Sequence, residues 1–173
     1  MDVLDAIKER RSIRFFTNQS VSEEEVKTLI DLARHAPSAG NIQPWEFIIV
    51  KNAEIKHELA IAALNQTFIE QAPVVIVVCA DVSASEGGYG SRGATLYCLQ
   101  DTAAAAQNIL LTAYSIGLGT CWVGAFKEED VREALGIPNG VRPVAIVPVG
   151  HGTGSPPKHP RRALNEIIHH EKY

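Results

Sequence analysis

The sequence lacks the excess of basic residues with which nucleic-acid-binding proteins neutralise phosphates. It has 16 Lys and Arg against 20 Asp and Glu, so its formal net charge at pH 7 is -4. We therefore expect no nucleic-acid partner. A local gathering of arginines in this mildly acidic chain must serve a more restricted purpose.

Cysteine is also scarce. Cys79, Cys98 and Cys121 are odd in number, widely spaced and never arranged as C-x-x-C. Disulfide frameworks and zinc sites need paired or closely spaced cysteines. We predict three buried thiols, no metal site and a reducing compartment, the cytoplasm.

No stretch is apolar enough to predict a membrane span. Residues 102–126 contain no charged side chain, but Gln107, Asn108 and four consecutive alanines dilute their hydrophobicity. The first residues, MDVLDAIKERR, show no long apolar run, so we expect neither a secretory signal nor an anchor. We expect a soluble protein whose residues 1–173 form one domain.

Several nucleotide-binding and catalytic motifs are missing. There is no G-x-x-x-x-G-K-[ST] and no G-x-S-x-G, and the six histidines are scattered or terminal, which disfavours a His-based hydrolase. Residues 88–93 match G-x-G-x-x-G, but a dinucleotide-binding motif also needs an acidic residue about 20 positions later to hold the ribose. No Asp or Glu occurs between Asp101 and Glu128. We instead predict that residues 86–93 form a mobile loop near an active-site mouth.

The hydrophobic pattern predicts an α+β layer structure with a mixed sheet. Ser22 and Glu25 form a capping-box pair at the start of one helix, and the apolar run 73–80 indicates a strand buried on both faces. We expect helices at residues 3 to 10, 54–64, 97–115 and 128–135, the last ending before Gly136, and a further helix that begins at Ser22. We expect strands at residues 45–50, 73–80 and 144–149, and a strand or turn at residues 120–126.

The predicted helix 97–115 is nearly apolar all round. One face of a sheet would leave part of such a helix exposed. We therefore expect it to be buried centrally, most simply against its twin in a homodimer.

Arginines and a serine cluster in residues 10–14, and a second basic pair stands at 161–162. Forked guanidinium donors beside a hydroxyl suit a phosphate monoester dianion. Ile13, Phe15 and Phe16 are expected to fix the first cluster to the core. The alternative is a solvated, charged helix end.

Two further segments could line a site. Residues 37–45 (PSAGNIQPW) are stiffened by two prolines and offer neutral hydrogen-bonding side chains, which suits a flat ligand with polar edges. Residues 117–126 (GLGTCWVGAF) would expose backbone N–H groups beside an aromatic wall. A helix stop followed by a core strand explains the second segment equally well.

The chain resembles the FMN-dependent nitroreductase family in five stretches that follow one another in order. These stretches are RRSIRFF (10–16), APSAGNIQPWEF (36–47), APVVIVVCAD (72–81), AAAAQNILLTAYSIGLGTCWVGAF (103–126) and PRRALNEII (160–168). The resemblance spans essentially the whole chain. It implies a mainly antiparallel central sheet flanked by helices, with the long helix at the interface of a homodimer. It also implies two FMN molecules, each contacted by both subunits.

The resemblance also implies roles for individual residues. The cluster 10–12, with Arg161 or Arg162, would hold the FMN phosphate and ribityl chain, and Arg14 would lie near the N1/O2 edge. The corner 37–41 would reach in from the partner subunit, 123–124 would donate near N5 and O4, and Asn65, with Gln66, would meet the pyrimidine edge. The implied cofactor-binding residues are Arg10, Arg11, Ser12, Arg14, Pro37, Ser38, Ala39, Asn41, Asn65, Val123, Gly124, Arg161 and Arg162.

The implied function is a ping-pong cycle in which NADH or NADPH reduces FMN and a nitroaromatic, a quinone or another flat acceptor then takes the electrons. Flavin N5 would carry the chemistry and Arg14 would stabilise the charge of the reduced flavin. Alternatives are another reductive reaction of the family (dehalogenation, enone reduction or flavin fragmentation), an FMN carrier or sensor without turnover, and a cofactor-free dimeric domain. The chain departs from the family at two points. His159 stands at a place that is often basic in the family, and the short chain lacks room for the additional helices that longer members place over the substrate.

Overall fold

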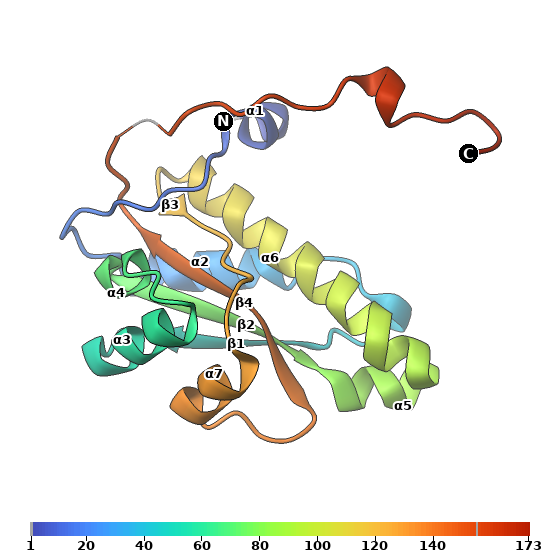
Figure 1. The fold of residues 1–173 in the computed structure, drawn as a ribbon, viewed down its shortest axis with the longest axis horizontal. Helices are drawn as coiled ribbons and strands as arrows, with labels where there is room; N and C mark the ends of the chain where they lie inside the picture. The colour runs from blue at the N-terminus through green and yellow to red at the C-terminus, as the bar shows by residue number, and fades with distance from the viewer. Residues whose placement is uncertain (1, 155) are drawn as a thin grey trace.

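A four-stranded antiparallel sheet forms the centre of the computed structural model, which describes residues 2–154 and 156–173 (Figure 1). The strands run in the order β1-β2-β4-β3. Their bounds are β1 Trp45–Val50, β2 Val74–Asp81, β3 Gly119–Thr120 and β4 Val141–Gly150. A parallel bridge between Ser12 and Thr120 adds the N-terminal segment beside β3. The predicted α+β class with a mainly antiparallel sheet is confirmed.

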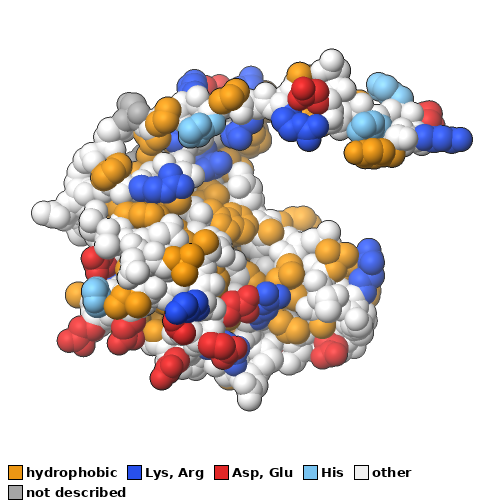
Figure 2. Space-filling view, in the orientation of Figure 1, with side chains coloured by type: hydrophobic (Ala, Val, Ile, Leu, Met, Phe, Trp, Pro, Cys, Tyr) orange, Lys and Arg blue, Asp and Glu red, His pale blue; other side chains and the backbone are white. Residues whose placement is uncertain are grey.

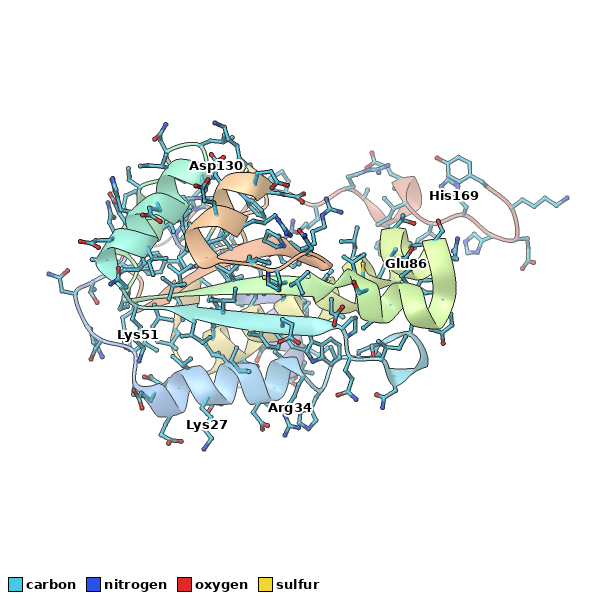
Figure 3. The ribbon with its side chains drawn as sticks, turned by 90° about the horizontal axis from the view of Figure 1, so that it is seen from below. Lys27, Arg34, Lys51, Glu86, Asp130 and His169 are labelled. Carbon is cyan, nitrogen blue, oxygen red and sulfur yellow. The ribbon has the colours of Figure 1, made fainter. Side chains whose placement is uncertain are left out.

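Helices cover both faces of the sheet, as the view from below shows, with α2 (Lys27, Arg34) on one side and α7 (Asp130) on the other (Figure 3). One face packs on α2 (Glu23–Ala33) and α6 (Cys98–Ser115), and the other on α3 (Ala53–Ala62), α4 (Phe68–Gln71) and α7 (Glu128–Leu135). Val74, Ile76 and Val78 of β2 enter the first core, whereas Val75 and Val77 enter the second. The strand is buried on both faces, as predicted.

Local signals set several helix ends. The Ser22 side chain accepts the N–H of Glu25, whose carboxylate accepts the N–H of Ser22, so the predicted capping box is confirmed. Helix α7 ends at Gly136, which adopts a left-handed φ of 62°. Helix α6 is the longest helix described, at 18 residues.

The prediction of a mobile loop at 86–93 is wrong. Helix α5 covers Val82–Arg92, is kinked at Tyr89 and Gly90, and continues through a π-helical turn, Gly93–Tyr97, into α6. The Asp81 side chain caps α5 by accepting the N–H of Ala84 at 2.8 Å. Glycine and serine favour loops locally, but this cap and tertiary packing outweigh the composition.

The two ends of the chain lie on the same side of the molecule. Helix α1 (Val3–Glu9) exposes its apolar side chains, with Val3 60% and Ile7 55% accessible. The tail 156–173 is extended and largely exposed apart from a 3-10 turn at Leu164–Glu166 (Figure 1). In the part of the chain that the structure describes, no helix combines the length and apolarity of a membrane span. Cys79, Cys98 and Cys121 are free and buried, as predicted.

Candidate functional site

A cleft of about 560 Å³ lies between the segment after α1 and the tail; we call it the basic cleft. Lys and Arg side chains gather on this part of the surface (Figure 2). The cleft is lined by Lys8, Arg10, Arg11, Ser12, Arg14, Pro156, Pro157, Lys158, His159 and Arg161. The structure thus brings Arg161, of the second predicted basic pair, beside the first arginine cluster.

Backbone pairing fixes the arginine segment against β3. The N–H of Ile13 donates to the carbonyl of Thr120 at 2.8 Å, and a Cβ on Gly119 would lie 2.8 Å from Cγ1 of Ile13. Phe16 forms a bridge with Gly152. The expectation that Phe15 is a third anchor is wrong, because its side chain is 70% exposed.

Arg10 is a partly buried cation of the cleft. Its Nε is buried and has no hydrogen-bond partner among the described residues. Burial, followed by the charges of Arg161 and Arg11, lowers the pKa of Arg10. A dianionic phosphate would supply both the missing acceptor and the missing negative charge. The residues present therefore fit an FMN phosphate.

The two tail arginines face different ways. Arg161 lines the basic cleft. Arg162 instead donates to the carbonyl of Glu166 at 2.8 Å and lies 3.7 Å from its carboxylate. Lys158 pairs with Glu9 at 2.7 Å. Arg161 is thus the tail arginine that stands beside Arg10.

The cleft continues along an edge toward α4. The Arg14 guanidinium lies 5.8 Å from the ring centroid of Phe68, the first residue of α4. Asn65, just before it, is exposed and has a left-handed φ of 61°. The Gln66 amide donates to the carbonyls of Ala63 and Ala125, so it connects this turn to the segment 121–126. Arg14 thus contacts the start of α4, and Asn65 stands in the exposed turn that precedes this helix.

In the segment 121–126, the expected backbone donor Val123 is already occupied within the fold. The N–H of Val123 donates to the carbonyl of Ile146 at 2.9 Å, and Val123 is buried. This leaves Gly124, which is exposed, as the backbone donor at this edge. Beside it, Trp122 and Phe126 line a second cavity of about 310 Å³.

Residues 37–43 of the predicted corner 37–45, which we call the corner segment, have an unusual backbone. Gly40, Asn41 and Gln43 all have φ near 56°. Left-handed backbone costs about 1–2 kcal/mol at a non-glycine residue, less at Asn, so contacts must hold this shape. Ser38 Oγ accepts the N–H of Gln43 at 3.0 Å, and the Tyr89 ring packs against Gly40.

Asp101 of α6 is a functional candidate that the sequence analysis missed. Both of its carboxylate oxygens lie 3.2 Å from the N–H of Ala39, and burial raises its pKa. The available signal was its position: it is the last charged residue before a run, 102–126, that has none. The corner segment is thus anchored to the first turn of α6.

The corner segment and the basic cleft lie at opposite ends of α6. Tyr114, near the end of α6, lines a cavity together with Arg10 and Arg11. Asp101, which holds the corner, is 13 residues earlier, a separation of about 20 Å at 1.5 Å per residue. Figure 1 shows the corner beside α5, far from β3. A single chain therefore does not bring Ser38 and Asn41 to the arginines.

Comparison with known proteins decides the family. The model described as "Nitroreductase family" matches residues 7–67 and 57–151. The chain belongs to the nitroreductase family. A relative from Methanothermobacter thermautotrophicus is 38% identical over 160 residues, covering 90% of this chain and 80% of the relative. The "FMN reductase (NADPH)" of Bacillus subtilis is 32% identical over 185 residues, covering 99% of this chain and 74% of that protein. The predicted family is confirmed.

Solved structures of the nitroreductase family share the fold. The NADPH:FMN oxidoreductase of Vibrio harveyi, complexed with NAD+, has a TM-score of 0.91 at 29% identity, covering 99% of this chain and 77% of that one. Nitroreductase A of Vibrio parahaemolyticus has a TM-score of 0.91 at 28% identity, covering 100% and 78%.

Proposed function

We propose that this member of the nitroreductase family is an NAD(P)H-dependent FMN oxidoreductase that works as a homodimer. The observation that carries the proposal is the basic cleft, where the buried Nε of Arg10 lacks a partner among the described residues and two further arginines stand nearby. Relatives named FMN reductase and NADPH-flavin oxidoreductase support the cofactor and the reductant. The buried free thiols suit a reducing compartment, so we propose the cytoplasm.

The chain's residues would divide the work of holding the cofactor. Arg10, Arg11, Ser12 and Arg161 bind the phosphate end. Arg14 keeps a positive charge near the pyrimidine edge, where negative charge develops during reduction. Bound FMN supplies hydride and electron transfer at its N5.

The other side of the site would be formed mainly by backbone and neutral groups. The Gly124 N–H and the exposed Asn65 offer donors to the polar edge of the ring system. Val123 supplies packing there, because its own N–H is bonded to Ile146. These groups orient the ring, and no side chain needs to act as a nucleophile or a general base.

A second copy of the chain completes the site in this proposal. The corner segment, with Pro37, Ser38, Ala39 and Asn41, lies too far from its own basic cleft, so it serves the cleft of the partner copy. The partly exposed side of α6 carries Leu99, Ala103, Gln107 and Leu111 at four-residue spacing, and its three apolar side chains offer a surface for that copy.

The electron acceptor is proposed to be a flat compound such as a nitroaromatic or a quinone. Trp122 and Phe126 flank Gly124 and line the cavity beside it, so a planar molecule would meet aromatic side chains there. Glu128 also lines this cavity, but its carboxylate accepts two hydrogen bonds from Arg142, at 2.9 and 2.6 Å, and this contact lowers its pKa.

FMN titration of the apoprotein, followed by flavin fluorescence, tests the proposal together with NAD(P)H oxidation in the presence of a quinone. We expect one FMN per chain, and Arg10→Ala should weaken binding at least tenfold. Arg34→Ala is the matched control, because Arg34 pairs with Asp31 on α2, away from the cleft (Figure 3). Wild-type protein that binds no FMN, or that binds it without oxidising NADH or NADPH, would contradict the proposed function.

A further inference from the structure

Asp101 is a buried carboxylate that serves the corner segment rather than its own helix. Both oxygens accept the N–H of Ala39 at 3.2 Å, and the side chain is only 7% exposed. Among the described residues, no cation pairs with it. Burial of a charge without a counter-ion is unfavourable. An apolar residue would pack on α6 without that penalty.

The corner segment needs such an anchor to keep its shape. Gly40, Asn41 and Gln43 occupy left-handed backbone, which a free loop would leave. Ser38 ties the segment to itself through Gln43, and Tyr89 packs against Gly40. Of the polar contacts described, only the one from Asp101 connects the corner segment to the rigid helix α6.

We propose that Asp101 is a positioning residue that holds the corner segment in the shape required to complete the cofactor site of the partner copy. This inference rests on the proposed function. Helix α6 then serves two sites: its last turn reaches, through Tyr114, a cavity that Arg10 and Arg11 of its own basic cleft also line, and its first turn positions the corner for the partner's cleft.

Substitutions at both ends of the contact test the inference. Asp101→Ala removes the acceptor, and Ala39→Pro removes the N–H while leaving α6 unchanged; Ser38, with ψ of 153°, is already compatible with a following proline. We expect each to weaken FMN binding at least tenfold. Asp101→Asn keeps a carbonyl oxygen for Ala39 and should bind within threefold of wild type.

Two controls separate positioning from general damage to α6. Thr112→Val alters another buried polar residue of the same helix and should leave FMN affinity unchanged. The double variant, Ala39→Pro with Asp101→Ala, should bind no more weakly than either single variant, because both remove one contact. The molecular mass and melting temperature of the apoprotein, measured alongside, show that each variant is folded and associated.

Mixed dimers show in which copy Asp101 acts. One chain carries Asp101→Ala, the other carries Arg10→Ala, and two different tags isolate the mixed species. If the corner serves the partner copy, one site combines an intact cleft with an intact corner, so the mixed dimer binds one FMN with wild-type affinity. If Asp101 acts within its own chain, neither site is intact and no tight binding remains.

The outcomes for Asp101 and for the proposed function are distinguishable. Wild-type protein without FMN affinity would refute the proposed function. Tight wild-type binding that Asp101→Ala and Ala39→Pro leave unchanged would refute this inference alone, as would a mixed dimer without a tight site. Should Asp101→Ala fail to fold, Ala39→Pro decides by itself, both as a homodimer and in the mixed dimer with Arg10→Ala.

Discussion

The basic side chains near the cleft differ in whether they already contact an acidic residue. Those that do not are the ones available to bind an anion. Arg162 and Lys158 already contact Glu166 and Glu9. Arg10 instead has a lowered pKa, caused first by burial and then by the nearby charge of Arg161. Such a gathering of like charges is favourable only with an anion between them.

The tail arginines therefore predict a difference between two neighbouring substitutions. Arg161→Ala should weaken FMN binding at least tenfold, because one charge-assisted hydrogen bond contributes about 1.5–3 kcal/mol. Arg162→Ala should change the affinity less than twofold, because that side chain contacts Glu166. Fluorescence titration of the two apoproteins measures both values. The reverse order would show that the tail rearranges around the cofactor.

Asp101 also predicts how stability depends on pH. Its pKa is raised above the ordinary 3.8 by burial, so the folded chain binds the proton more strongly than the unfolded chain does. The unfolding free energy contributed by Asp101 therefore falls as pH rises from 3.8 through the raised value. Asp101→Asn should gain stability relative to wild type across that window and level off above it.

Urea unfolding of both apoproteins at fixed concentration and several pH values measures this difference. Acids with lowered pKa values, such as Glu25 and Glu128, cancel because both proteins contain them. Cys98 lies near Asp101, but burial raises its pKa from 9.0, so it stays neutral in the same window. A stability difference that does not change with pH would contradict the account of Asp101.

Among the elements, those with strong local signals were predictable and those held by distant contacts were not. The Ser22–Glu25 pair, the apolar run of β2 and Gly136 each set an element from within a few residues. Helix α5 escaped prediction because its packing against Gly40 is set by the fold and is not encoded locally. For the same reason, a lone Asp101 in the sequence could not reveal its contact with Ala39.

The attachment of the arginine segment to β3 predicts a steric effect. In Gly119→Ala the new Cβ would lie 2.8–2.9 Å from three atoms of the branched Ile13 side chain. We expect a loss of about 1–3 kcal/mol in unfolding free energy, together with weaker FMN binding as the arginines shift. Urea unfolding and FMN titration measure the two effects.

Gly87→Ala is the matched control for Gly119→Ala. No atom lies within 4 Å of its added Cβ, and it stands inside α5. The alanine should gain up to about 1 kcal/mol through helix propensity. Equal effects of the two substitutions would contradict the proposed contact between Ile13 and Gly119.

At the scale of the whole molecule, one chain contains two hydrophobic cores, but it contains only parts of the proposed cofactor site. The basic cleft and the corner segment lie about 20 Å apart along α6. Apolar side chains remain exposed on α1, including Leu4 at 56%. Both features support the proposal that a second copy completes the site.

Association should therefore control cofactor binding. Light scattering should give the mass of two chains, and Leu111→Arg on the partly exposed side of α6 should give one chain with FMN affinity reduced at least tenfold. Ile61→Arg, on the opposite side of the sheet and 51% exposed, should leave both properties unchanged. A monomeric variant that binds FMN as tightly as wild type would refute the shared site.

The central claim is tested most directly by the visible absorption spectrum of the FMN-loaded protein in an anaerobic cuvette, first with NADH or NADPH and then with a nitroaromatic or a quinone. We predict that the flavin bands bleach with the reduced nicotinamide and return with the acceptor. Bands that persist after either nicotinamide would contradict an NAD(P)H-dependent oxidoreductase and would leave a protein that binds flavin without turnover.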